Sequence, residues 1–169
     1  MGEPLKRSGM PLLMKSFLII LLTLIAATAS LAQSNRIGAF KFEKRQGTHN
    51  ALVVFHTRAF EPSKHEVKAR NYQTIVDGRF AHGTDGNVPN IEIRSIKLSL
   101  DGTEVAIPRK LYSDCFEPSL DGRYLAIRFG RNFQSVIISM SGSDGAGTYK
   151  VVWRFQRNGY HSRSFSQDF

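Results

Sequence analysis

Residues 149–165 read YKVVWRFQRNGYHSRSF, and this stretch decides the fold class. From Tyr149 to Phe155, large apolar side chains alternate with mostly polar ones. This two-residue period is typical of a strand with one buried face. Asn158-Gly159 follows and favours a tight turn, because both residues tolerate positive φ. The stretch therefore predicts an antiparallel hairpin that turns at Asn158-Gly159 and returns along residues 160–165.

Similar turn-forming dipeptides recur along the chain. Asp-Gly occurs at 77–78, 85–86, 101–102, 121–122 and 144–145. Two further hairpins are predicted by alternating runs on either side of a turn: 96–100 with 105–107, and 125–129 with 136–140. Shorter runs predict earlier strands at 40–43, 51–55, 72–76 and from residue 91. Together they predict an all-β fold, an antiparallel β-sandwich of about nine strands.

Three local irregularities are also expected. The apolar phase shifts between Ile93 and Ile96, which predicts a β-bulge near Arg94-Ser95. Apolar residues at helical spacing between two prolines predict one short helical turn near 109–116. Ser63 and Glu66 have the spacing of a capping box, so residues 64–70 form either a helical turn or a polar loop.

The N-terminal segment predicts export. Basic residues precede the apolar run 17–25, and the small residues 26–30 lead to Ser30-Leu31-Ala32. This order is typical of a signal peptide, here 1–32, and the apolar run is short for a membrane span. A retained N-terminal anchor is the alternative, and Met14 is a second candidate for the true start. We expect one domain over 33–169, in a periplasmic or secreted protein with no transmembrane anchor after cleavage.

Charge and cysteine content limit the possible partners. The formal net charge is +9, which favours an anionic envelope component, although another protein is an open alternative. Nucleic acid is not expected, because the aromatic residues that could stack bases fall on the inward phase of the strands. The single cysteine, Cys115, cannot form an internal disulfide, so the fold depends on its core.

One candidate ligand site is a glycine-rich loop. Its residues Gly142, Ser143, Asp144, Gly145 and Gly147 could present backbone N–H groups to an anion. A second Gly-Ser/Thr-Asp-Gly run contains Asp85, which could lie at the same end of the sandwich. Two carboxylates are too few for a calcium site, so no metal is expected. The alternative is a flexible hairpin loop without a ligand.

The other candidate is a basic face on the last hairpin. Lys150 and Arg154 share the outward side of one strand, and Arg157 and Arg163 follow across the turn. We expect these side chains to form a cationic patch for an anionic partner, with a merely solvated sheet face as the alternative.

No motif indicates catalysis or a cofactor. The chain lacks Gly-x-Ser-x-Gly and a P-loop, and its histidines do not have metal-ligand spacing. We therefore expect a binding or structural protein without a cofactor. The alternative is an exported hydrolase that uses the loop aspartates Asp85, Asp114 or Asp144.

Several short runs follow one another in a fixed order: Gly83-Thr84-Asp85-Gly86, Ile107-Pro108, Tyr112-x-Asp114, Pro118 and Asp144-Gly145-Ala146-Gly147-x-Tyr149. In type and order they resemble a group of small exported bacterial all-β proteins with no known activity. The resemblance implies an exported all-β domain. It assigns no catalytic or binding residue.

Overall fold

A computed structural model of the chain describes residues 36–70, 73–143, 145, 147–159 and 161–167. Within these residues, eleven strands and three 3-10 helices follow one another: β1 (Gly38–Gln46), β2 (His49–Ala59), η1 (Pro62–Lys64), β3 (Val67–Arg70), β4 (Gln73–Val76), β5 (Arg79–Phe80), β6 (Ile91–Leu100), β7 (Thr103–Val105), η2 (Arg109–Leu111), β8 (Leu125–Phe129), η3 (Arg131–Phe133), β9 (Ser135–Gly142), β10 (Tyr149–Gln156) and β11 (His161–Gln167).

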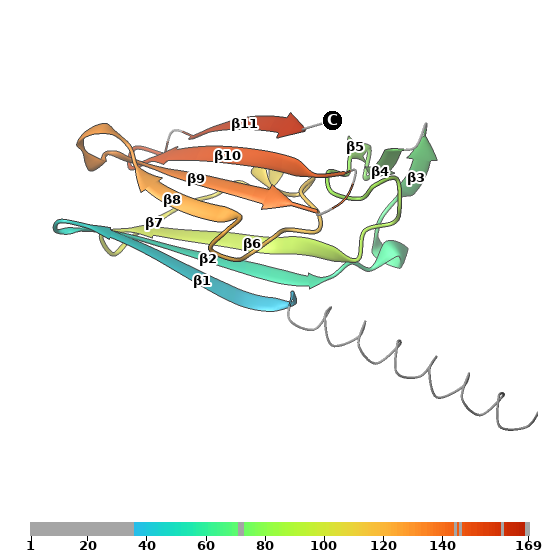
Figure 1. The fold of residues 1–169 in the computed structure, drawn as a ribbon, viewed down its shortest axis with the longest axis horizontal. Coiled ribbons are helices and arrows are strands. Elements are labelled where there is room, and N and C mark those ends of the chain that lie inside the picture. Colours follow the sequence, from blue (N-terminus) through green and yellow to red (C-terminus); the bar gives the residue numbers. More distant parts are fainter. Residues whose placement is uncertain (1–35, 71–72, 144, 146, 160, 168–169) are drawn as a thin grey trace, which may run out of the picture. The chain divides into compact units, whose positions relative to one another are not determined.

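Two four-stranded sheets form the layers of a sandwich, in the strand orders β1-β2-β6-β7 and β11-β10-β9-β8 (Figure 1). A third, smaller sheet of order β3-β4-β5 lies at one end of them (Figure 1). Strand pairing is antiparallel within all three sheets. The predicted antiparallel β-sandwich is therefore confirmed, with two more strands than the nine expected from the sequence.

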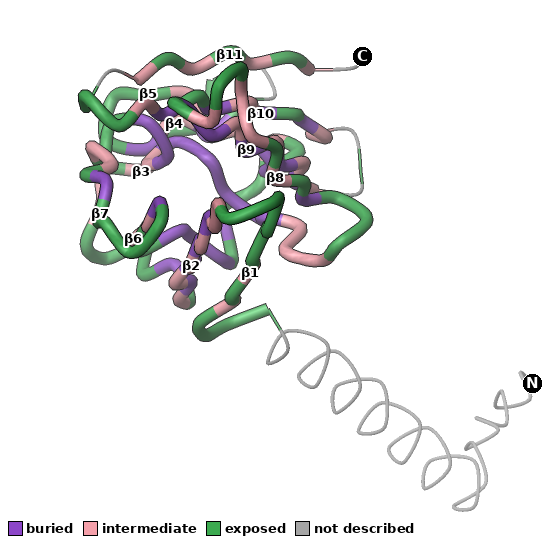
Figure 2. Tube along the Cα trace, turned by 90° about the vertical axis from the view of Figure 1, so that its left-hand side faces the viewer, coloured by how far each residue is buried: buried purple, intermediate pink, exposed green. Residues whose placement is uncertain are grey.

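The core lies between the two larger sheets. Buried and less buried positions alternate along β2, as the two-residue period of a half-buried strand requires (Figure 2). Trp153 of β10 is fully buried near Phe55 of β2, and its indole Nε1 donates to the Leu111 carbonyl at 2.8 Å. Burial of a side chain of this size contributes about 4–6 kcal/mol.

Residues 106–124, here the crossover segment, connect the two layers. The Glu117 N–H donates to the Ile91 carbonyl of β6 at 3.0 Å, and the Ser119 N–H donates to the Ser141 carbonyl of β9 at 3.0 Å. The segment therefore satisfies backbone groups of both sheets. It contains η2, which confirms the short helical turn predicted near 109–116.

The Asp-Gly pairs at 77–78 and 101–102 form two-residue hairpin turns as the sequence predicts, whereas Asp121 and Gly122 do not take positive φ. At 77–78 the φ angles are 51° and 75°, and at 101–102 they are 49° and 81°. Val76 lies opposite Arg79, so the 77–78 turn contains two residues, as type I′ hairpins do. The predicted bulge is also confirmed: His56 pairs with Ser95 while Thr57 pairs with Ile93, which leaves Arg94 as the extra residue.

The last hairpin forms, but its register differs from that of a two-residue turn. Such a turn at 158–159 would place Ser162 opposite Phe155, whereas the structure places His161 there. The Gly159 N–H bonds to the Gln156 carbonyl at 3.0 Å, and Gly159 takes φ 84°. The longer turn shifts β11 by one residue, and a shift of one residue moves every side chain of a strand to the other face.

Residues 64–70 form neither of the structures predicted for them. The 3-10 turn η1 ends at Lys64, and residues 67–70 form the strand β3. Val67 pairs with Val76 and packs against a small cluster that includes Phe60 and Phe116. This tertiary contact outweighs the weak local preference for a helical turn.

The predicted signal peptide 1–32, with its alternative start at Met14, lies outside the described residues. Backbone contacts group Arg36–Phe169 into one unit. In the part of the chain that the structure describes, no helix is long and apolar enough to cross a membrane.

Candidate functional site

The structure brings the two glycine-containing loops together. The Asp85 carboxylate accepts a hydrogen bond from the Gly147 N–H. The other N–H groups described in the loop also have partners: Ser143 donates to the Glu117 carbonyl, Gly145 to the Ser143 hydroxyl and Thr148 to the Gly145 carbonyl. Asp144 lies outside the described residues. In this arrangement Asp85 holds the loop, and the described amides are not free to bind an anion.

Gly142 has a packing role at the start of this loop. A Cβ at this position would overlap the ring of Tyr149, which is buried. The Tyr149 hydroxyl donates to the Phe116 carbonyl at 2.9 Å. Gly142 therefore allows the tyrosine to close one end of the core.

Three cations share the outward side of the β8–β11 sheet. Arg154 of β10 pairs with Ile137 of β9, which in turn pairs with Arg128 of β8, so the three residues form one row across the sheet. Lys150 lies further along β10 on the same side, and all three cations are exposed. Arg128, Lys150 and Arg154, here the basic face, make no ion pair with any described residue.

The other two arginines of the predicted patch lie elsewhere. Arg163 pairs with Trp153 and is on the inward side of the sheet, because of the shifted register of β11. Its guanidinium donates to both carboxylate oxygens of Asp114 at 2.9 Å. Arg157 bonds to the Asp101 carboxylate and to the Leu100 carbonyl, and so ties the hairpin end to the opposite sheet.

Asp114 is the centre of a buried ionic cluster. Arg79 donates to it at 2.6 Å from one side and Arg163 from the other. The neighbouring Cys115 is buried, and burial raises the pKa of its thiol, so it is a poor nucleophile. His82 packs on Phe165, and burial lowers the pKa of its imidazole to about 4. Asp114 therefore has a structural role here, and this geometry does not support its use in a hydrolase.

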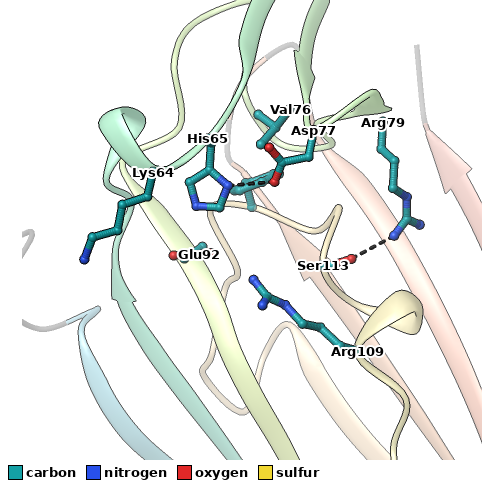
Figure 3. Close-up of a pocket in the computed structure, with 9 residues that line it drawn as sticks. Lys64, His65, Val76, Asp77, Arg79, Glu92, Arg109 and Ser113 are labelled. Carbon is teal, nitrogen blue, oxygen red and sulfur yellow. Dashed lines mark hydrogen bonds and ion pairs between the residues drawn. The ribbon is translucent and has the colours of Figure 1, made fainter.

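A pocket of about 330 Å³ opens between the small sheet, β6 and the crossover segment (Figure 3). We call it the His65 pocket. Its polar lining comes from residues far apart in the sequence: Lys64 at the end of η1 and His65 after it, Asp77 in the β4–β5 turn, Arg79 of β5, Glu92 of β6, and Arg109 and Ser113 of the crossover segment. This site could not be predicted from the sequence, because its residues come together only in the tertiary structure.

The most ordered feature of the His65 pocket is an imidazole–carboxylate pair. The Asp77 carboxylate lies 2.7 Å from His65 Nδ1 and accepts the Glu66 N–H at 3.0 Å. These two bonds, the imidazole contact first, lower the pKa of Asp77. The His65 ring stacks on Phe60 with centroids 4.7 Å apart, and its side chain is only 10% exposed. The bond to Asp77 at the ring edge and the stacking on Phe60 together hold the His65 ring in one orientation.

Two carboxylates of the pocket already have partners, but one cation does not. Glu92 accepts from Arg58 Nε at 2.6 Å, and Asp77 is paired with His65. Arg109 is exposed and makes no hydrogen bond or ion pair through its guanidinium with any described residue. Among the described residues, no group of three or more His, Cys, Asp or Glu side chains could hold a metal ion.

No family model, no curated protein and no solved structure matches this chain. The two candidate sites, the basic face and the His65 pocket, are therefore defined by the geometry of this chain alone.

Proposed function

We propose that this protein is an exported envelope or secreted binding protein that contacts an anionic phospholipid surface through its basic face. The observation that supports this most directly is the row Arg128–Ile137–Arg154, in which two unpaired guanidinium groups flank one apolar residue. Neighbouring strands are about 4.8 Å apart, so the two arginines stand about 10 Å apart on a regular surface. No described residue that points outward from this sheet is acidic.

The strength of such a contact can be estimated from the charges. Each Lys or Arg near an anionic membrane surface contributes about 1 kcal/mol. Arg128, Lys150 and Arg154 would together contribute about 3 kcal/mol, or roughly a hundredfold in partitioning. The attraction would weaken with salt, because the Debye length falls to about 8 Å at physiological ionic strength.

Vesicle cosedimentation tests the proposal. The protein should bind phosphatidylcholine vesicles that contain phosphatidylglycerol at low salt, and bind much less at high salt or without phosphatidylglycerol. The variant R128Q/K150Q/R154Q should lose roughly a hundredfold in partitioning. The matched control K41Q/K44Q/K97Q removes three exposed lysines of the other large sheet and should retain binding. Equal loss in both variants, or no binding at low salt, would overturn the proposal.

Export is the second part of the proposal, and the N-terminal segment supports it. The charged start, the apolar run 17–25 and the small residues before Ala32 are typical of a cleaved signal peptide. N-terminal sequencing of the protein from the periplasm or medium should begin at Gln33. Recovery of the intact precursor from the soluble cell interior would overturn this part.

A further inference from the structure

We propose that the His65 pocket binds the phosphoryl group of a phosphate-bearing small molecule or headgroup. The pocket is built from η1, the β4–β5 hairpin, β6 and the crossover segment, none of which contributes to the basic face. The two proposals are therefore independent. The volume of about 330 Å³ is at the lower end of the range for small-molecule sites.

Arg109 provides the unpaired charge. Its guanidinium points into the pocket from η2 (Figure 3) and makes no hydrogen bond or ion pair with any described residue. A guanidinium offers five donors in a planar fork that matches two oxygens of a phosphate. An anion is the ligand that would use these donors.

His65 provides a buried polar atom that lacks a partner. Its Nδ1 is engaged by Asp77, whereas Nε2 is buried and has no hydrogen-bond partner among the described residues. Figure 3 shows the ring and the Arg109 guanidinium turned toward the same space. A buried polar atom without a hydrogen bond costs free energy, so a ligand that bonds to Nε2 would remove this cost and bind more tightly.

Ser113 adds a donor on the other side of this space. Its hydroxyl oxygen accepts from Arg79 Nη1 at 2.7 Å, which leaves the hydroxyl proton for another acceptor. The Arg79 side chain is itself held by the buried Asp114 at 2.6 Å. The Ser113 hydroxyl is therefore connected through Arg79 to the buried Asp114 carboxylate.

The carboxylates of the pocket do not exclude an anion. Glu92 forms an ion pair with Arg58, and the Asp77 carboxylate is occupied by hydrogen bonds from His65 and the Glu66 N–H. Of the other cations in the lining, Lys64 pairs with Glu61 and Arg79 with Asp114. Arg109 makes no ion pair with any described residue, so its guanidinium is the group that an entering anion would contact.

A phosphoryl group fits these partners better than a carboxylate. The Nε2 atom of His65 donates when the ring carries two protons and accepts when it carries one. A phosphate near neutral pH exists with and without a proton on oxygen, because its second pKa is about 6, so it can complement either form of the ring. A carboxylate at this pH only accepts hydrogen bonds.

NMR of the purified protein tests the proposal, with the Arg109 Nε–H and His65 ring signals as reporters. Inorganic phosphate and glycerol 3-phosphate are the probes, and acetate at matched ionic strength is the comparison. Saturable shifts with one or both phosphate probes, and none with acetate, support the proposal. Saturation with glycerol 3-phosphate alone identifies a headgroup, and saturation with inorganic phosphate alone identifies the free anion. No shift with either probe, or an equal shift with acetate, overturns it.

Two variants locate the binding. R109Q should weaken it by at least about tenfold, the loss of one charge-assisted hydrogen bond, while R131Q, which removes an exposed arginine of η3, should leave it unchanged. H65N keeps a side-chain donor near Asp77 but has no atom at Nε2, so it should also bind more weakly. If R109Q and H65N bind as well as the unchanged protein, the ligand is not in this pocket.

Discussion

The guanidinium of Arg163 donates to both oxygens of the buried Asp114 carboxylate, at 2.9 Å each. Arg163 lies on the last strand and Asp114 on the crossover segment, so this contact fastens the edge of one sheet to the segment that joins the two layers. It forms only because the register of β11 turns Arg163 inward.

We predict that R163M destabilises the fold by about 2–3 kcal/mol, because it leaves a buried carboxylate with only one of its two cationic partners. Urea unfolding of R163M beside R154M measures the effect. Arg154 is exposed on the basic face, so R154M should change the free energy of unfolding by less than about 0.5 kcal/mol. Equal stability of the two variants would show that the ionic cluster does not hold β11.

Gly142 should not tolerate even one methyl group. G142A places a Cβ against the Tyr149 ring, which is packed in the core, and should cost about 1–3 kcal/mol through overpacking. G122A is the matched control, because a Cβ at Gly122 meets no atom within 4 Å. A thermal unfolding scan of both variants compares them. A loss no greater in G142A than in G122A would contradict the packing role.

His82 should make the fold less stable in mild acid. Burial, the largest cause, lowers its pKa from 6.5 to about 4. Between these values the unfolded chain takes up a proton that the folded chain does not. The free energy of unfolding therefore falls as the pH drops from about 6.5 toward 4.

The variant H82F tests this, because phenylalanine cannot take up the proton and can still pack on Phe165. Denaturant midpoints measured across this pH range should fall less steeply in H82F than in the unchanged protein. H161Q, which replaces the histidine at the turn end of β11, should show the same dependence of the denaturant midpoint on pH as the unchanged protein. An identical slope in H82F would contradict the prediction.

Cys115 should be inert in the folded protein. Its side chain is 1% exposed, and burial raises the pKa of the thiol, so little thiolate is present at neutral pH. Iodoacetamide should modify it only in denaturant, as mass spectrometry of the intact protein would show. Rapid modification under native conditions would mean that the crossover segment opens readily.

Local features were the ones that could be read from the sequence. The bulge at Arg94 followed from the phase shift between Ile93 and Ile96, and the turn at Asp101-Gly102 from the tolerance of both residues for positive φ. These features depend on a few neighbouring residues, whose conformational preferences are the same in any sheet.

The candidate sites depend on contacts between residues that are far apart in the sequence. The basic face was predicted in part: Lys150 and Arg154 lie together, whereas Arg163 does not, because one extra residue in the turn reversed the faces of β11. The His65 pocket could not be predicted at all. Its residues come from segments far apart in the chain, and none has a local pattern that marks it.

By itself, the sequence determined that the chain forms antiparallel hairpins with one apolar face, because the two-residue period and the Asp-Gly turns are encoded by adjacent residues. Only the tertiary structure decided which charged groups meet. It brought Arg163 to Asp114 and His65 to Asp77, and it left the Arg109 guanidinium without a hydrogen bond or ion pair to any described residue. The physical reason is that strand register and the packing of the crossover segment are set by the whole core, and a shift of one residue exchanges buried for exposed side chains.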